Sequence, residues 1–407
     1  MRWIYTDPND IAESLTRGDV LHRIDAWWTA FADQSGDLEE AFRGRADWDV
    51  SAWMAQHLQA IAPELMWEFG PGLESEHRLV ITPETHRHLR PMLERILERA
   101  PKLEGWEFYP HRLAEDAAHT LKLATARAGG DAAGALVAAR PGRNRRIDLV
   151  YHLREDAARD ADYAFHQAFV LSEALLGEEL LDTWVGAIEV ATLATPRGLR
   201  RLLPAPQAPE GLVPLDRLQP TVEALIATLV AGLPPTPMHE TTPLAPEEDL
   251  RAWSSFELQP VEAEDYARQD DLLVALTPLP EMTIAAHDDP RFYSRRFSRV
   301  GETFCYVKLD GSEEIDLERF PDREAIETLI NQALVTRRLG AAVGGGTGRR
   351  YSYVDLALSD VPRGLETIQE TLRTAEMPRR TWLLFHDCEL RDEWVGLWPQ
   401  TPRPPLG

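Results

Sequence analysis

Apolar and polar side chains alternate most clearly in residues 351–358. The apolar side chains share one face of this stretch, and the other face carries Tyr351, Tyr353 and Asp355. A period of two residues is typical of a half-buried β-strand. The glycine-rich residues 340–348 come directly before it, so we expect a β-hairpin in which the glycines form the turn.

Two amphipathic stretches flank this hairpin, at residues 321–339 and 362–376, with apolar positions at helical spacing. A strand-like run lies on the outer side of each predicted helix. The resulting order, β-α-β-β-α-β, predicts a ferredoxin-like sandwich within residues 251–400.

Residues 1–62 are predicted to form a helical N-terminal layer that packs on the next domain. Apolar side chains recur at helical spacing from Val20 to Phe31, and Ser35–Gly36 is expected to end that helix. Six of the twelve tryptophans lie in the first 67 residues. They either pack the helices onto their neighbours or form an aromatic interface with a partner.

Residues 63–194 alternate between strand-like and helix-like stretches, which predicts an α+β domain with a mixed or antiparallel sheet. The domain divides into two halves of pattern β-β-α-β, and whether they are a true duplication stays open. A proline-rich connector follows at residues 195–250, with a short helix predicted at Thr221–Ala231. The fold class is therefore α+β, with a helical layer first and a ferredoxin-like domain last.

The chain is strongly acidic, with a formal net charge of −24 over 407 residues. Such a chain repels nucleic-acid phosphates and anionic membranes, so the partner we expect is a protein, and a basic one would be favoured. The start of the chain lacks the pattern of a signal peptide, and the longest apolar stretch, 222–233, is too short to cross a bilayer. With only Cys305 and Cys388 there is no disulfide framework, and we predict a cytoplasmic protein.

Candidate chemistry is mostly excluded by context. The glycine run leads into a strand and not into a helix N-terminus, so we expect no nucleotide cofactor. Cys305, His386 and Cys388 could converge on zinc, but strand alternation puts Cys305 and His386 on opposite faces, so we expect no metal. No motif of a nucleophilic or metal-dependent enzyme is present, which favours a protein without catalytic residues.

We expect an aromatic face on the C-terminal sheet, which suggests a second function, the binding of RNA. A further predicted strand places Tyr306 on the same face as Tyr351 and Tyr353, and Arg349 and Arg350 begin the second hairpin strand. This arrangement resembles the RNA-recognition motif, in which aromatic side chains on the central strands stack on bases. The resemblance implies an open sheet face that binds single-stranded RNA.

Two features oppose that implication. Asp355 lies on the same predicted face, and the surrounding domain is acidic, so phosphates would be repelled. The alternative is that this face packs against the connector, against residues 251–299 or against another subunit.

Across most of its length the chain is also similar to a bacterial two-domain family of unknown function. The similarity rests on two stretches: Trp67 to Tyr109, with WEFGP, LVITP and GWEFY, and Gly345 to Asp355, with Gly-Gly-x-Thr-Gly before Tyr-x-Tyr-x-Asp. The resemblance implies no activity.

Three functional hypotheses follow. The first is a protein-binding or regulatory module without enzymatic activity, which the acidic charge and the lack of catalytic motifs favour. The second is an RNA-binding module that uses the tyrosines of the C-terminal domain. An enzyme whose site has no recognisable motif is the third.

Overall fold

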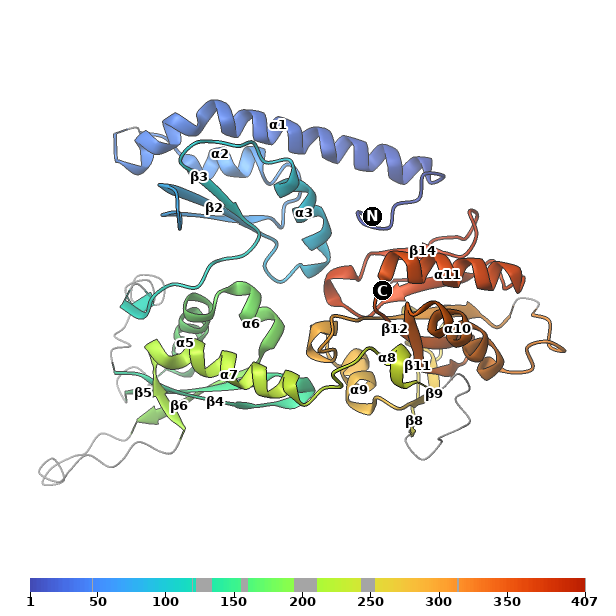
Figure 1. Ribbon diagram of the computed structural model, residues 1–407. Helices are drawn as coiled ribbons and strands as arrows, with labels where there is room; N and C mark the ends of the chain where they lie inside the picture. The colour runs from blue at the N-terminus through green and yellow to red at the C-terminus, as the bar shows by residue number, and fades with distance from the viewer. Residues whose placement is uncertain are drawn as a thin grey trace, which may run out of the picture. The chain divides into compact units, whose positions relative to one another are not determined.

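The computed structural model describes residues 1–45, 47–118, 120–121, 134–154, 160–193, 211–242, 253–312 and 315–406 (Figure 1). The chain forms two compact units. The first comprises Met1–Pro110, Thr236–Pro290 and Gly301–Gly407, and the second comprises His111–Pro235 and Arg291–Val300. Helices occur with mixed and antiparallel sheets, so the α+β class is confirmed. None of the described helices is long and apolar enough to span a membrane.

The first unit begins with the predicted helical layer. Helices α1 (Ile11–Phe42) and α2 (Val50–His57) pack with α3 (Arg90–Glu98) on a three-stranded sheet. Its strands lie in the order β1 (Met66–Gly70), β2 (His77–Thr82), β3 (Trp106–Tyr109), with β1 antiparallel and β3 parallel to β2. Aromatic side chains dominate the core between helices and sheet, among them Trp27, Trp28, Phe31 and Trp106. The tryptophans of this layer therefore act in packing.

Helix α1 does not end at Ser35–Gly36 as predicted but continues to Phe42. Leu38 is completely buried in the same core as Phe31, so the apolar face extends past the glycine. A glycine inside a helix costs only about 1 kcal/mol relative to alanine, and burial of one leucine side chain outweighs that cost. Tertiary packing thus overrides the local stop signal.

The second sheet of this unit has seven strands in the order β14-β13-β10-β12-β11-β9-β8, with every neighbouring pair antiparallel. The strands are β8 (Ser254–Glu257), β9 (Leu272–Thr277), β10 (Thr303–Asp310), β11 (Gly340–Gly348), β12 (Tyr351–Leu358), β13 (Thr381–Phe385) and β14 (Trp394–Gly396). The elements from β10 to β13 follow the predicted order β-α-β-β-α-β. Three further strands extend the sheet beyond the four that this order supplies.

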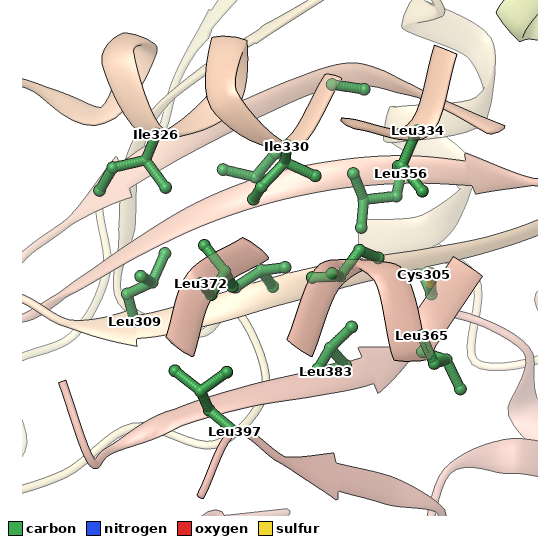
Figure 2. Packing of buried hydrophobic residues seen from close by; sticks show 14 of the residues in the cluster. Cys305, Leu309, Ile326, Ile330, Leu334, Leu356, Leu365, Leu372, Leu383 and Leu397 are labelled. Carbon is green, nitrogen blue, oxygen red and sulfur yellow. The ribbon is translucent and has the colours of Figure 1, made fainter. Parts of the chain in front are cut away.

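Helices α10 (Arg323–Arg337) and α11 (Val361–Thr374) cover one face of this sheet. In Figure 2, Ile326, Ile330 and Leu334 of α10 and Leu365 and Leu372 of α11 point toward strand residues such as Leu309, Leu356 and Leu383. Shorter helices, α8 (Met238–Thr241) and α9 (Pro280–Asp288), precede β10. The helix-covered face is an ordinary apolar core.

The glycine run lies inside strand β11 and not in the turn, which contradicts the hairpin turn predicted there. The turn is instead made by Arg349 and Arg350 between β11 and β12. Gly344 has φ +124° and sits where the pairing with β12 changes register. A Cβ on Gly345 would collide with the carbonyl oxygen of Tyr353 on β12. The glycines are therefore needed for close approach of β11 to its neighbours and for a local bulge.

The second unit contains a four-stranded sheet in the order β6-β5-β4-β7. The strands are β4 (Leu136–Pro141), β5 (Ile147–Arg154), β6 (Val185–Leu193) and β7 (Leu212–Pro214), and helices α5 (Ala161–Leu176), α6 (Glu178–Trp184) and α7 (Leu218–Ala231) accompany them. The first half predicted within residues 63–194 contains β1, β2, α3 and β3, and the second contains β4, β5, α5, α6 and β6. The two halves form separate sheets in separate units. The helix predicted inside the connector is α7, and with β7 it belongs to the core of this unit.

Replacing Gly345 by alanine tests the close approach inside β11. We expect Gly345→Ala to lower the free energy of unfolding by about 2 kcal/mol, because the new methyl group meets backbone that cannot move aside. Gly36→Ala is the control, since nothing lies within 4 Å of its Cβ position and it lies within α1. That variant should be stabilised by about 0.5 to 1 kcal/mol. Urea unfolding measures both, and equal stability of the two variants would contradict the strand assignment.

Candidate functional site

The sheet face opposite α10 and α11 carries the predicted tyrosines, and we call it the tyrosine face: Tyr306, Lys308, Tyr351, Tyr353 and Trp382. Each of these side chains is at most 1% exposed. Residues 258–271, here called the cover segment, and the chain end at residues 402–406 lie over this face. Of the alternatives left open by the sequence, packing against residues 251–299 is the one observed. Among the described residues, this face therefore offers no open stacking surface.

Polar contacts fasten the cover segment to the tyrosine face. The Lys308 ammonium donates to the carbonyl oxygen of Tyr266 at 2.5 Å. The Tyr353 hydroxyl shares its proton between the carbonyl oxygen of Arg268, at 3.1 Å, and the nearer carboxylate of Asp271. The indole N–H of Trp382 donates to the carbonyl oxygen of Pro402 at 2.6 Å. Because buried polar groups need partners, these bonds make the cover part of the fold and not a loosely resting loop.

Two fully buried carboxylates organise the end of the face near the hairpin turn. Asp271 accepts hydrogen bonds from the Tyr353 hydroxyl and from the backbone N–H groups of Arg350, at 2.7 Å, and Tyr351, at 2.9 Å. Asp310 accepts from the guanidinium groups of Arg350, at 2.8 Å, and Arg380, at 2.7 Å. Arg350 is thus occupied in a structural pair, although its side chain remains partly exposed.

The pKa values of these groups follow from burial and from their partners. Burial alone would raise the pKa of Asp310, but hydrogen bonds from Arg350, Ser312 and Arg380 outweigh it and lower the pKa to about 2. Burial, followed by the hydrogen bond to Asp271, raises the pKa of Tyr353. Burial lowers the pKa of Lys308 to about 8, against the pull of nearby aspartates. The face therefore holds the Asp310 carboxylate, whose pKa is lowered, beside the Lys308 ammonium, which loses its proton more easily than an exposed lysine.

The predicted site residues divide into three groups in space. Tyr351, Tyr353 and Arg350 join the network around Asp271 and Asp310. Tyr306 and Asp355 are directly opposite each other on β10 and β12, next to His386. Arg349 is exposed at the turn, and only its backbone N–H bonds to the cover segment. The strand face of the tyrosines is thus the predicted one, and its shielding by residues within 251–299 is one of the alternatives that the sequence left open.

Cys305, His386 and Cys388, the three residues considered as zinc ligands, do not converge on one site in the described part of the chain. Cys305 lies in the apolar core under α10 and α11, whereas His386 packs against the Tyr306 ring on the opposite face. Within the described ranges no group of three histidine, cysteine, aspartate or glutamate side chains is arranged to hold a metal ion. Cys305 and His386 thus lie on opposite faces of the sheet.

Lys308 provides a test of the buried network through pH. Its pKa falls from 10.5 to about 8 on folding, so the unfolded chain holds more protons between these values, and stability rises with pH in that window. Below pH 8, Lys308 is protonated in the folded and in the unfolded chain, and the free-energy cost of burying its ammonium group is fully present. We expect the wild type to gain about 2 kcal/mol relative to Lys308→Met from pH 8 to about pH 10. Urea titrations at each pH measure this, and parallel curves would contradict it; the exposed Lys102→Met is the control.

A separate groove of about 500 Å³ lies between residues 2–9, helix α11 and strand β14. Apolar and aromatic side chains contribute much of its lining, namely Ile4, Tyr5, Leu365, Val395 and Trp398. Two acidic side chains, Asp7 and Glu366, and two arginines, Arg2 and Arg373, also line it. Arg2 is paired with Glu13 at 2.8 Å, and Arg373 donates to the carbonyl oxygen of Leu397 at 2.6 Å. Glu366 is exposed and forms no ion pair within the described part of the chain. The groove therefore combines apolar contact area with unpaired negative charge.

Glu393 holds the wall formed by the N-terminal residues. Its buried carboxylate accepts three backbone N–H groups, from Trp3 at 2.6 Å, Ile4 at 3.1 Å and Tyr5 at 2.9 Å. The Tyr5 ring stacks on Phe385 with ring centroids 4.8 Å apart. Residues nearly four hundred positions apart thus meet in one unit, and no local pattern in the sequence marks this groove.

Removing the Glu393 carboxylate should loosen that wall. Glu393→Ala leaves three backbone N–H groups without their partner, and we expect a loss of about 3 kcal/mol in the free energy of unfolding. Glu370→Ala removes an exposed carboxylate paired with Arg337 at 2.9 Å and should cost less than about 1 kcal/mol. Chemical denaturation compares the two, and faster proteolysis within residues 1–10 should accompany only the first. Equal losses would mean that Glu393 is not an anchor.

Comparisons of the chain with protein-family models, with curated proteins and with solved structures give no match. The family resemblances described from the sequence therefore remain predictions, and the geometry alone has to support a function.

Proposed function

We propose that the chain is a non-enzymatic protein-binding module that holds an extended segment of a partner in the groove between residues 2–9, α11 and β14. The observation that carries this proposal is the groove itself. Its volume of about 500 Å³ lies within the range of about 300 to 1,000 Å³ that is typical of ligand sites. A few side chains of an extended peptide fit in such a space.

The lining supports a partner of defined chemistry. Ile4 is 37% exposed at the groove, and Tyr5 and Trp398 offer aromatic surface, which favours apolar side chains in the partner. Asp7 and the unpaired Glu366 favour lysine or arginine beside them. The net charge of −24 attracts a basic segment from a distance as well.

The tyrosine face supports RNA binding less well, because its aromatic side chains are at most 1% exposed and Arg350 is paired with Asp310. Stacking would first require the cover segment and the chain end to leave. Neither cysteine forms a disulfide within the described residues, and both are buried, which suits a reducing compartment; we extend the proposal to the cytoplasm.

Selection of peptides on the full chain tests the proposal. Random peptides displayed on phage should enrich for sequences that combine apolar residues with lysine or arginine. Titrated by fluorescence anisotropy, the selected peptides should bind Ile4→Glu at least about tenfold more weakly, since a charge replaces the apolar contact. Glu366→Lys should weaken binding about fivefold by reversing an exposed charge.

Ile284→Glu is the matched control, because Ile284 is also 37% exposed but lies on α9 and does not line the groove. Binding to this variant should equal that of the wild type. Peptides that bind Ile4→Glu and Glu366→Lys as tightly as the wild type would place the binding surface elsewhere and reject the groove.

A further inference from the structure

A second, smaller cavity of about 90 Å³ lies where the cover segment meets the sheet. Its lining residues come from the cover segment (Arg268, Gln269, Asp270), from α9 (Ala286, His287) and from the tyrosine face side of the sheet (Tyr306, His386). None of them lines the groove described above. The cavity is therefore a separate feature, in which four chain segments meet: the cover segment, α9, β10 and the residue that follows β13.

Tyr306 contributes a buried hydroxyl whose hydrogen-bonding capacity is unused. The side chain is completely buried, and its hydroxyl has no hydrogen-bond partner within the described residues. Burial raises the pKa of this phenol to about 12, so the hydroxyl keeps its proton at neutral pH and can donate. A buried donor without an acceptor is unfavourable, and a ligand that accepts from it would remove that cost.

Arg268 supplies positive charge to the same cavity. Its guanidinium donates to the carbonyl oxygen of Phe385, and it forms no ion pair with a carboxylate in the described ranges. The backbone of Arg268 is anchored on both sides, because its N–H donates to the carbonyl oxygen of Pro405 and its carbonyl oxygen accepts from Tyr353. The guanidinium is therefore held beside the cavity with donors to spare.

The acidic groups near the cavity limit the charge of a ligand. Asp355 does not line it, and one of its oxygens already lies 3.3 Å from Nε2 of His386 and 3.1 Å from the Gln269 amide nitrogen. Asp270 lines the cavity from an exposed position, as does His287. Two carboxylates this close disfavour a doubly charged anion more than a singly charged one.

We propose that this cavity binds a small free monocarboxylate of the size of formate or acetate. A guanidinium presents paired donors that match the two oxygens of a carboxylate, and the Tyr306 hydroxyl adds a further donor. The volume of about 90 Å³ is roughly that of three water molecules, which suits an anion of three or four non-hydrogen atoms. The site depends on the cover segment and not on the groove, so it is independent of the proposed peptide binding.

Ligand-detected NMR titration of acetate and formate against the full chain tests this inference. We expect saturable binding in the millimolar range, because so few atoms can contribute only a limited affinity. Tyr306→Phe removes only the hydroxyl and should weaken acetate binding about tenfold without lowering the melting temperature, since that hydroxyl has no partner in the free protein. Arg268→Gln should abolish the saturable signal.

Tyr151→Phe is the matched control, because it removes a buried tyrosine hydroxyl that bonds to Ser172 in the other unit. It should leave acetate binding unchanged and lower the melting temperature. Sulfate at equal ionic strength serves as the doubly charged probe and should not compete. No saturable acetate signal, equal binding by Tyr306→Phe, or competition by sulfate at similar concentration would each overturn the assignment.

Discussion

Both faces of the seven-stranded sheet have to be shielded from water, and this requirement shapes the larger unit. On one side α10 and α11 supply apolar side chains that need no polar partners. On the other side the Tyr353 hydroxyl and the Lys308 ammonium are buried against acceptors, whereas the Tyr306 hydroxyl has none within the described residues. Asp271 and the carbonyl oxygens of Tyr266 and Arg268 provide those acceptors. The groups that cover this face are thus also the groups that satisfy it.

The same requirement explains why a small cavity lies at this place. A helix packs on a sheet through a regular apolar stripe, whereas the cover segment is attached to the sheet by individual hydrogen bonds. Such a segment leaves irregular space where its side chains and those of α9 do not interdigitate. Arg268 and Tyr306 line that space because hydrogen bonds and strand pairing fix their backbones.

The groove has a different origin. Residues 2–9 precede α1 and lie beside the edge strand β14. The buried carboxylate of Glu393 holds their backbone by accepting three N–H groups. Hydrogen bonds to a charged acceptor are stronger than those between neutral groups, so a short extended segment can be fixed there without pairing as a strand. The groove is consequently wide enough for a polypeptide segment, whereas the cavity accommodates only a few atoms.

Local pattern alone determined the order of the elements from β10 to β13 and the apolar faces of α10 and α11, but not strands β9 and β14. It also determined the side of β12 on which Tyr351, Tyr353 and Asp355 lie, because side-chain period follows from backbone geometry. It misplaced the turn, since a glycine needed for close approach within β11 is indistinguishable in sequence from one needed for a positive φ. Only the tertiary structure decided what covers the tyrosines and which residues form the groove and the cavity. Those contacts join residues such as Trp3 and Glu393, far apart in the chain, and no local periodicity encodes such pairings.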